Sequence, residues 1–536
     1  MKIKLGVFIL LLSMLFENSF AQSGKTGDAP KHEFRGVWVA TVNNLDYPSK
    51  STPWPTAHKE EWKNLISKYK ELGFNAVIFQ IRPAGDAFYP SEFAPWSRYL
   101  TGKQDLPPKP EYDPLAFIIE ETHRQGMEFH AWMNPFRLSM DLDSSQLSIR
   151  HAFYQHRNWV VRYGKRYYLN PGLPEVRNHL RDVVAEVVQK YDVDAIHFDD
   201  YFYPYPIANE AFPDSLTYKY YGAATHKDIG NWRRQNIDEF VELISTTIKA
   251  IKPEVQFGIS PFGVWRNKDK DPAGSDSRAS VSSYDDLYAD VVKWLRLEWI
   301  DYVVPQIYWN IGYEVADYNK LVNWWSQHQY NGKVYIGHAA YKIGQDAQPG
   351  WQEPDQMARQ IRLTRRNRRI DGSVFFRSGS VLADPKNLKD TLRYYYANLA
   401  LPPKNENLSL PIQAEPAQVK VKNKRGDAQI RWKPNKNDVA KPPHYYAVYR
   451  FKGTTVRDLE EATNLIHLSS FATKDKKYAI LDKRIEEGET YTYAITAVNR
   501  ANSEGRISEA VTIQRKNGRI VKYKSQAAKA RKRKKK

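Results

Sequence analysis

The chain has 536 residues, 42% of them hydrophobic and 26% charged, which is the composition of a globular protein too long for one ordinary core. It contains no cysteine, which excludes a disulfide framework and a thiolate metal site. Its formal net charge is +19, and its aromatic content of 13% favours flat ligands that stack on rings.

The first residues have the pattern of an export signal. Lys2 and Lys4 precede the apolar stretch 5–16, which is too short to span a bilayer stably, and small residues lead to Ala21. We therefore expect a signal peptide over residues 1–21 and an exported protein, in the periplasm or secreted. No cysteine follows the cleavage site, so we do not expect a lipoprotein, and no later stretch is long and apolar enough to span a membrane.

Between residues 30 and 400, short apolar runs alternate with amphipathic helical stretches. The predicted strands are 36–42, 76–81, 128–133, 195–198, 256–260, 302–307, 334–340 and 373–376. The predicted helices are 58–72, 114–125, 174–191, 232–251, 284–297, 317–328, 353–366 and 385–397. This repetition predicts an α/β fold, a (β/α)8 TIM barrel. An open doubly wound sheet is the alternative, but no glycine-rich phosphate turn follows the first strand.

The rest of the chain differs in composition. Residues 401–414 are polar and contain proline, which predicts a linker. Residues 415–515 change to short alternating strands with an early Trp432, typical of an all-β sandwich, and the last strand resembles that of fibronectin type III modules. Residues 516–536 carry eleven Lys or Arg and no acid, so we expect a disordered tail. Its partners would be anionic envelope polymers or lipid head groups rather than specific nucleic acid.

The segment 197–204, at the end of the fourth predicted strand, is the best candidate for an active site. Alternation along the strand puts His197, Asp199 and Tyr201 on one side, which in a barrel is the lumen. Functional residues of such barrels lie at the carboxyl ends of the strands. Asp199 is therefore the better catalytic candidate and Asp200 a near second, although an isolated Asp-Asp pair more often caps a helix or forms ion pairs.

Cleavage of a glycosidic bond needs a second carboxyl group a few ångströms from the first. The candidates on the same face of the barrel are Asp46, Asp86, Glu92, Asp276 and Asp285. We prefer Asp276, because it follows the fifth strand, next round the barrel from Asp199.

Other strand ends supply polar and aromatic side chains that could bind substrate. They are Gln80, Arg82, Asn134, Arg137, Ser260, Trp265, Arg266, Gln306, Tyr308, Trp309, Tyr341 and Lys342, together with Tyr201 and Tyr203 beside the acidic pair. Several are cationic, which indicates a ligand with carboxylates. His130, His197 and His338 fall within strands without the spacing of a metal site, so we expect neither a metal nor a cofactor.

Six segments carry a likeness to a known family: 34–41, 169–176, 198–203, 258–267, 305–309 and 335–337. Through them, residues 34–398 resemble the glycosyl-hydrolase-like 10 family of bacterial exported proteins. The resemblance implies a barrel glycosidase, and one branch of the family cuts peptidoglycan glycan strands already stripped of their peptides. It also implies an active cleft formed by Asp199, Asp200 and Tyr201 and lined by Arg35, Gln80, Asn134, Arg137, Ser260, Arg266 and Gln306. Asn170 stands where some relatives carry Asp, so it is given no catalytic role.

Three functions remain open on these grounds. The first is a glycoside hydrolase that acts on a bacterial envelope polysaccharide, above all peptide-stripped peptidoglycan, with two carboxyl groups as acid and as nucleophile or base. The second is a non-catalytic polysaccharide-binding protein that keeps the barrel as a receptor. The third and weaker one is a metal-dependent deacetylase.

Overall fold

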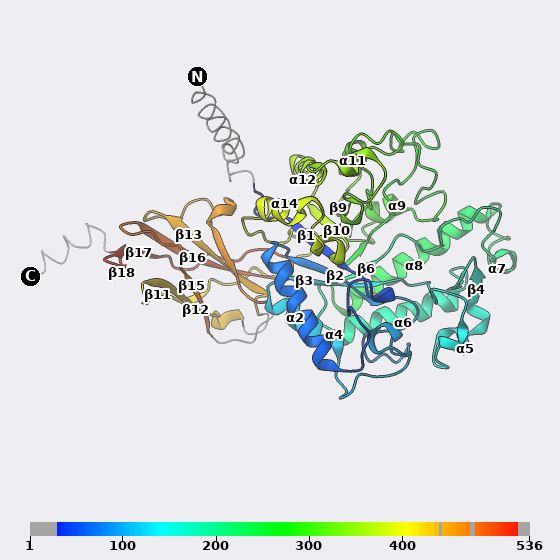
Figure 1. Cartoon of the computed structure of the whole chain (residues 1–536), viewed down its shortest axis with the longest axis horizontal. Helices are drawn as coiled ribbons and strands as arrows, with labels where there is room; N and C mark the ends of the chain where they lie inside the picture. The colour runs from blue at the N-terminus through cyan, green and yellow to red at the C-terminus, as the bar shows by residue number, and fades with distance from the viewer. Residues whose placement is uncertain (1–28, 439–441, 472–476, 524–536) are drawn as a thin grey trace, which may run out of the picture.

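The computed structural model describes residues 29–438, 442–471 and 477–523 (Figure 1). Eight parallel strands close into a barrel in the order β1-β10-β9-β8-β7-β6-β3-β2, which confirms the predicted (β/α)8 fold. The strands are β1 Phe34–Val39, β2 Ala76–Arg82, β3 Glu128–Met133, β6 Ala195–Phe198, β7 Gln256–Ile259, β8 Tyr302–Val303, β9 Lys333–Ala339 and β10 Gly372–Phe376. The predicted signal peptide, residues 1–21, lies outside the described residues.

The helices that follow the strands form the outer layer of the barrel. They are α2 Pro55–Glu71, α4 Pro114–Arg124, α6 Pro174–Lys190, α8 Ile229–Ile251, α9 Val291–Arg296, α10 Tyr318–Gln327, α12 Gln356–Arg366 and α14 Leu388–Tyr395. Proline at the first position starts α2, α4 and α6, where its missing N–H leaves no hydrogen bond unmade. Aspartate side chains cap α4, α8, α9 and α10 by accepting from backbone N–H groups of the first turn.

Shorter elements lie in the connections between strands and helices. They are α3 Arg98–Thr101, α5 Ala152–Gln155, the hairpin β4 Val160–Tyr163 with β5 Arg166–Leu169, α7 Ser215–Tyr221, α11 Pro349–Gln352 and α13 Ser378–Leu382. The predicted strand 302–307 is shorter in the structure, because Pro305 has no N–H to donate to β9, and pairing resumes only as isolated bridges at Gln306.

Two apolar layers hold the barrel together. Large rings fill the lumen, among them Phe34, Trp38, Trp132, Tyr302 and Tyr335. The opposite faces of the strands pack against the helices in a second, larger core. Gly258 makes room for the lumen, since a Cβ there would lie 2.0 Å from the Tyr302 ring.

The C-terminal region forms two antiparallel sheets, as predicted. One has the order β11 Ala417–Lys424, β12 Asp427–Lys433, β15 Tyr478–Asp482, and the other β14 Leu465–Leu468, β13 Tyr445–Lys452, β16 Thr490–Val498, β17 Val511–Lys516, β18 Arg519–Lys522. Trp432, Tyr446 and Tyr493 are buried in the core of this sandwich. The likeness to fibronectin type III modules stays a prediction.

The start of the predicted tail is ordered, contrary to expectation. Residues 519–522 form β18, which pairs with β17, because Ile520 packs into the sandwich core while its neighbours face solvent. Residues 524–536, the rest of that tail, lie outside the described residues.

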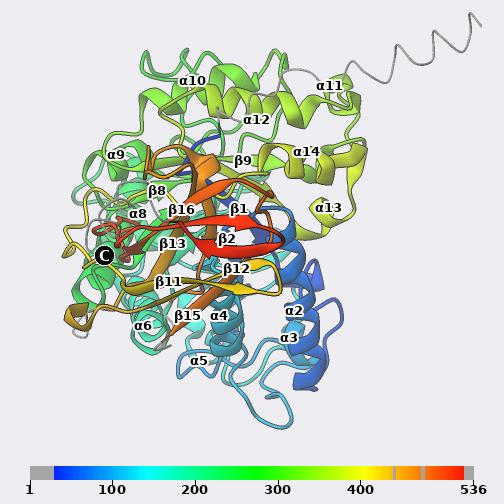
Figure 2. The same ribbon diagram turned by 90° about the vertical axis from the view of Figure 1, so that its left-hand side faces the viewer.

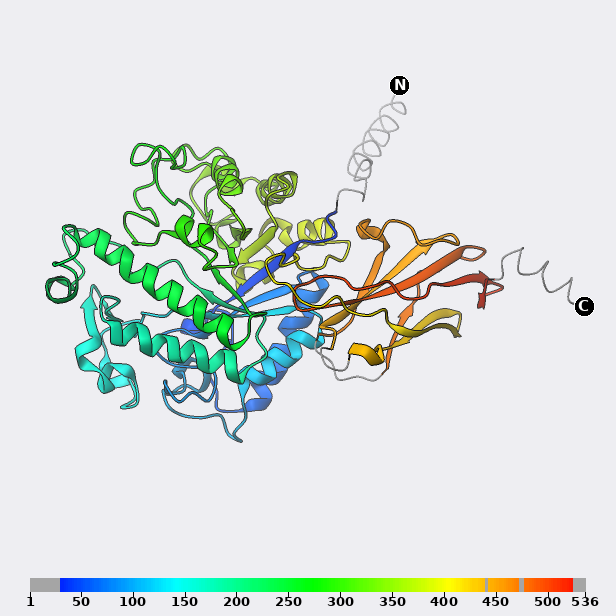
Figure 3. The ribbon, with the colours of Figure 1, turned by 180° about the vertical axis from the view of Figure 1, so that it is seen from behind.

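The sandwich packs against the amino end of the barrel strands, on the side away from α5 and α7 (Figures 1, 2 and 3). Asn502 of the sandwich donates a hydrogen bond to Glu128 at the start of β3, with 2.9 Å between Nδ2 and Oε1. His444 lies 3.2 Å from the carboxylate of Asp194, just before β6. All these side chains are buried, so the two parts of the chain share a polar interface inside the molecule.

Among the described residues, no helix combines the length and the apolar character that crossing a membrane requires.

Candidate active site

Strand β6 carries the acidic pair to the carboxyl end of the barrel. Asp199 is half-buried, and its Oδ2 accepts a hydrogen bond from Asn134 Nδ2 at 3.0 Å. Its Oδ1 accepts from Gln306 Nε2 at 3.2 Å and from the backbone N–H of Asp200 at 3.0 Å. Donors from neighbouring parts of the barrel thus fix the direction of this carboxylate.

Asp200 differs sharply from its neighbour in environment. It is 4% exposed and accepts a hydrogen bond from the hydroxyl of Tyr205. Burial, together with the charge of Asp199, raises the pKa of the Asp200 carboxyl well above its usual range. Asp200 therefore keeps its proton to a higher pH, and it lies beside the hydrogen-bonded carboxyl of Asp199. A protonated carboxyl next to a second carboxyl is the arrangement that general acid catalysis requires.

A network of amides and a guanidinium orients Asn134. Its Oδ1 accepts from Gln80 Nε2 at 2.6 Å and from Arg137 Nη2 at 2.8 Å. Gln80 is itself held by the backbone N–H groups of Thr41 and Val42, each 2.9 Å from its Oε1. Since both donors approach the oxygen of Asn134, its nitrogen must face Asp199.

The floor of the site is the polar part of the lumen. Ser260 lies 3.0 Å from Nε2 of His197, and Gln306 donates to the backbone oxygen of Ser260 at 2.9 Å. Trp38 can only donate, so Nε2 of His197 accepts and Nδ1 carries the proton toward Tyr302, 3.1 Å away. Burial lowers the pKa of His197 well below its usual value, so this imidazole is neutral at neutral pH. It supports Ser260 and does not contact either carboxylate directly.

Aromatic rings form two walls beside the acidic pair. Tyr205, Phe262 and Trp309 make edge-to-face contacts with centroids 6.1 Å and 5.5 Å apart. Tyr308 and Tyr341 pack on Phe376, with each pair of centroids 6.0 Å apart. Of these residues, Tyr205, Phe262 and Phe376 were not predicted. The first two stand next to the predicted segments Asp199–Tyr203 and Ser260, and Phe376 ends the eighth strand, so position alone could have indicated them.

Two arginines contribute positive charge near Tyr201. Arg137 donates to the Tyr201 hydroxyl and, through Nε, to the backbone oxygen of Pro83 at 2.8 Å. Burial raises the pKa of the Tyr201 hydroxyl, and the charges of Arg137 and Arg166 oppose that rise. In residues 29–438, 442–471 and 477–523, neither arginine forms an ion pair.

The structure does not bring Asp276, the preferred second carboxyl, into this cluster. Its side chain is 74% exposed and forms an ion pair with Lys320 of α10. The connection after β7 packs against α10, where Trp324 Nε1 donates to the Ala273 backbone oxygen at 2.9 Å, rather than over the lumen. The carboxyl that the fold places beside Asp199 is that of Asp200.

The other acidic candidates also have partners elsewhere. Asp46 accepts from Arg377 and from the N–H groups of Ala40 and Gly379. Asp86 accepts from the backbone N–H of Ala84, Glu92 pairs with Lys190, and Asp285 pairs with Arg266.

Arg35 and Arg82 were expected in the cleft, and the structure places both outside the lumen. Arg35 is the second residue of β1, near its amino end, and its guanidinium pairs with Glu33 at 2.6 Å and lies over the Tyr396 ring. At Arg82 the pairing with β3 shifts register after Gln80, which turns the side chain toward α6. The Arg82 guanidinium is buried and has no hydrogen-bond partner in the described part of the chain.

Several other predicted binding residues stabilise the surrounding loops instead. Tyr203 is buried between Phe212 and Tyr288, Trp265 packs on Tyr284 and Trp324, Arg266 pairs with Asp271 and Asp285, and Lys342 pairs with Asp346. The predicted residues that do meet at the acidic pair or its walls are Gln80, Asn134, Arg137, Tyr201, Ser260, Gln306, Tyr308, Trp309 and Tyr341.

No three His, Asp or Glu side chains of the described residues are arranged as a metal site.

Comparison with known proteins places the chain among glycosyl hydrolases. The family model of glycosyl hydrolase-like 10 matches residues 33–353. The glycosyl hydrolase YngK of Bacillus subtilis (strain 168) is 43% identical over 486 residues, 90% of this chain and 93% of that protein. The glycosyl hydrolase DigH of Escherichia coli (strain K12) is 37% identical over 391 residues, 68% of this chain and 87% of that protein. Among solved structures, the PgaB (BpsB) glycoside hydrolase domain of Bordetella bronchiseptica aligns over 67% of this chain and 99% of that domain, with 14% identity and a TM-score of 0.45.

Proposed function

The chain belongs to the glycosyl hydrolase-like 10 family, and we propose that it hydrolyses glycosidic bonds in peptidoglycan glycan strands that have lost their peptides. The observation that carries the proposal is the pairing of Asp199, a hydrogen-bonded carboxyl, with Asp200, whose pKa is raised by burial.

The two carboxyl groups take different parts in the proposed reaction. Asp200 donates its proton to the glycosidic oxygen as the bond from that oxygen to the anomeric carbon breaks. Asp199 faces the positive charge that develops on the sugar and acts either as the nucleophile or as the base that activates water. Water then adds to the anomeric carbon. Its proton goes to Asp200 if Asp199 was the nucleophile, or to Asp199 if Asp199 was the base, and in that second case proton exchange with solvent restores both carboxyl groups.

The cations near Tyr201 support a substrate with carboxylates. Removing the peptides from peptidoglycan leaves a free lactyl carboxylate on every second sugar. Arg137 and Arg166 form no ion pair in the part of the chain that the structure describes, so a carboxylate of the substrate can be their partner. The aromatic walls around Tyr308 and Trp309 offer faces on which pyranose rings stack.

The predicted export and the basic C-terminus fit a polymer outside the cytoplasm. Residues 524–536 carry eight Lys or Arg, and they would hold the enzyme on the anionic wall. Deleting them should reduce sedimentation with purified sacculi at low salt. Unchanged sedimentation would remove this part of the proposal.

The test is incubation of the protein with amidase-stripped glycan strands, followed by an assay of new reducing ends and identification of the fragments by mass. We expect fragments with the wild-type chain and at least a ~10³-fold lower rate with Asp199→Asn. Binding of the strands without new reducing ends, unchanged in Asp199→Asn, would instead identify a receptor. Acetate release that stops on addition of a chelator would identify a deacetylase.

A further inference from the structure

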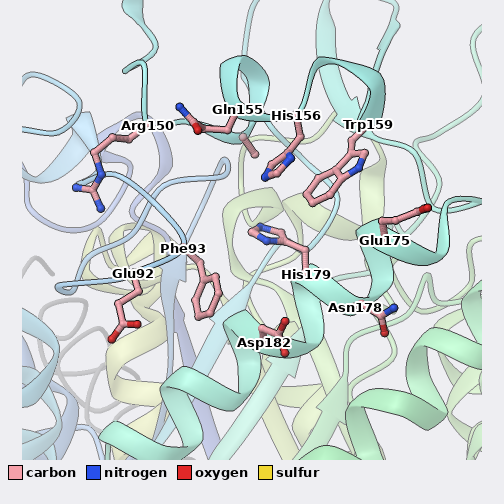
Figure 4. Close-up of a pocket in the computed structure, with 11 residues that line it drawn as sticks. Glu92, Phe93, Arg150, Gln155, His156, Trp159, Glu175, Asn178, His179 and Asp182 are labelled. Carbon is pink, nitrogen blue, oxygen red and sulfur yellow. The ribbon is translucent and has the colours of Figure 1, made fainter.

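A cavity lies between α6 and the short elements that precede it, and it shares no residue with the acidic cluster (Figure 4). Its volume is about 640 Å³, within the usual range of small-molecule sites. The residues that line it are Glu92, Phe93, Arg150, Ala152, Gln155, His156, Trp159, Glu175, Asn178, His179 and Asp182. Because α6 begins at the carboxyl end of the barrel, the cavity lies on the same end of the molecule as Asp199.

One side of the cavity is aromatic. The rings of His156 and Trp159 stack with their centroids 3.6 Å apart. His179 lies 5.3 Å from Trp159 and 5.9 Å from Phe93, and Figure 4 shows these four rings gathered around one space. The rings are half-buried, so part of each remains free to contact a ligand.

The other side is a row of polar side chains on one face of α6. Glu175, Asn178, His179 and Asp182 follow the spacing that brings side chains of a helix together. Nε2 of His179 is buried and has no hydrogen-bond partner among the residues that the structure describes. Burial, with help from the charge of Arg82, lowers the pKa of His179 to about 3, so this imidazole is a neutral hydrogen-bonding group.

The charges of the cavity decide which ligands fit. Of the three acids that line it, Glu92 pairs with Lys190 and Asp182 with Arg181, while Glu175 has no ion pair among the residues that the structure describes. The one strong base, Arg150, is paired with Asp105 at 3.0 Å. An anion would find no unpaired cation in the lining and would face the unpaired carboxylate of Glu175, whereas sugar hydroxyls would find acceptors on the carboxylates and an apolar face on the rings.

We propose that this cavity binds a neutral pyranose unit of a glycan, a hexose or N-acetylhexosamine that carries no carboxylate. The inference extends the proposed function, because neutral sugars alternate with carboxylate-bearing ones in a peptide-stripped strand. The surroundings of the acidic cluster differ, because Arg137 donates to Tyr201 there and forms no ion pair in the part of the chain that the structure describes.

The test uses the full chain with Asp199→Asn, labelled with 5-fluorotryptophan and followed by fluorine NMR. Trp159→Phe assigns the signal of Trp159, and Trp54→Phe assigns that of Trp54, which is 61% exposed and lies outside the cavity. The probes are chitotetraose, which is neutral, and tetragalacturonate, which has the same length and a carboxylate on each sugar.

We expect chitotetraose to move the Trp159 signal saturably while the Trp54 signal stays in place. Tetragalacturonate at the same concentration should cause less than about a tenth of that shift, since no lining cation is free to pair with its carboxylates and Glu175 repels them. His179→Ala should weaken the Kd for chitotetraose at least ~5-fold, as expected for loss of a ring contact that also supports Trp159, with the Trp54 signal unchanged.

A Trp159 signal that stays in place with chitotetraose, or that moves equally with both probes, overturns the inference. The readout requires no hydrolysis, so it is independent of the proposed function. A chain that binds chitotetraose at Trp159 but never cuts stripped strands would contradict only the proposed function.

Discussion

The amide of Asn134 presents its nitrogen, not its oxygen, to the carboxylate of Asp199, 3.0 Å away. The orientation follows from the two donors, Gln80 and Arg137, that occupy the oxygen. A side chain just after β3 therefore sets the direction of a carboxylate just after β6, and the acidic pair depends on its neighbours for its geometry.

Replacing Asn134 with aspartate removes the N–H donor that faces Asp199 and keeps the size and shape of the side chain. Asn134→Asp puts a second carboxylate against Asp199, so we expect a decrease in kcat/KM of about 10²-fold or more on stripped glycan strands. The thermal unfolding midpoint should change little, because Gln80 and Arg137 still find an acceptor. An unchanged kcat/KM would show that Asp199 has no part in the reaction.

The choice of acid is tested by two isosteric variants. Asp200→Asn removes the proton donor and should lower kcat by about 10³-fold. Asp276→Asn removes an exposed charge whose partner is Lys320, and kcat should stay within about twofold of the wild type. The reverse result, with Asp276→Asn inactive, would make Asp276 the second catalytic carboxyl, as its position after the fifth strand suggests.

The pH dependence should follow the proton on Asp200. Because the protonated form is the active one, kcat should decrease as the pH rises through the raised pKa of this carboxyl. The Tyr205 hydroxyl donates to the ionised form and so lowers that pKa; its removal in Tyr205→Phe should raise the pKa further. The alkaline limb of the kcat profile should then move to higher pH. A limb that moves to lower pH, or not at all, would assign it to another group.

Two substrates can distinguish a direct role of Arg137 in binding carboxylates from a general disturbance of the site. Arg137→Gln should raise KM about 10-fold on stripped strands, the value of one charge-assisted hydrogen bond. On strands whose lactyl carboxylates have been reduced to alcohols, the wild type and the variant should differ by less than about twofold. An equal loss on both substrates would mean that Arg137 acts only through Asn134 and Tyr201.

Asp194 should make stability depend on acid. Burial opposes its charge, but His123 at 2.8 Å and His444 at 3.2 Å hold the pKa of Asp194 well below its usual value of 3.8. A depressed carboxyl pKa stabilises the folded state above the unfolded value, and this stabilisation disappears as the pH falls through the folded value. Asp194→Asn should cost about 3–5 kcal/mol at pH 7, since two buried histidines lose their partner. In thermal unfolding from pH 7 to pH 3, the difference from the wild type should shrink; a constant difference contradicts the assignment.

The strands of the barrel could be predicted because each is a short apolar run buried on both faces, as at Ala195–Phe198. Alternation along that strand also indicated which side Asp199 faces. The hairpin β4–β5 was missed because its strands are four residues long and only partly buried. Its sequence therefore has no clear period.

The site was harder to predict where a long connection or a local irregularity of a strand determines the position of a side chain. Asp276 is next round the barrel from Asp199 in sequence order, but packing against α10 takes it to the surface. Arg82 ends the correct strand, and one register shift after Gln80 removes it from the lumen. Tyr205 was missed because a loop returns its hydroxyl to Asp200, five residues back, which no periodic pattern records.

The polar chain through the lumen has a consequence for dissecting this protein. From Ser260 it runs through His197, Tyr302 and His130 to Glu128, and Asn502 closes it from the sandwich. The family match ends at residue 353, whereas β10 at Gly372–Phe376 still has to fill the gap between β9 and β1. Truncation at residue 353 would remove β10 and leave the edges of β9 and β1 unpaired. Truncation after β10 would remove Asn502, which donates a hydrogen bond to the buried Glu128. The smallest folding unit is therefore larger than the region that defines the family.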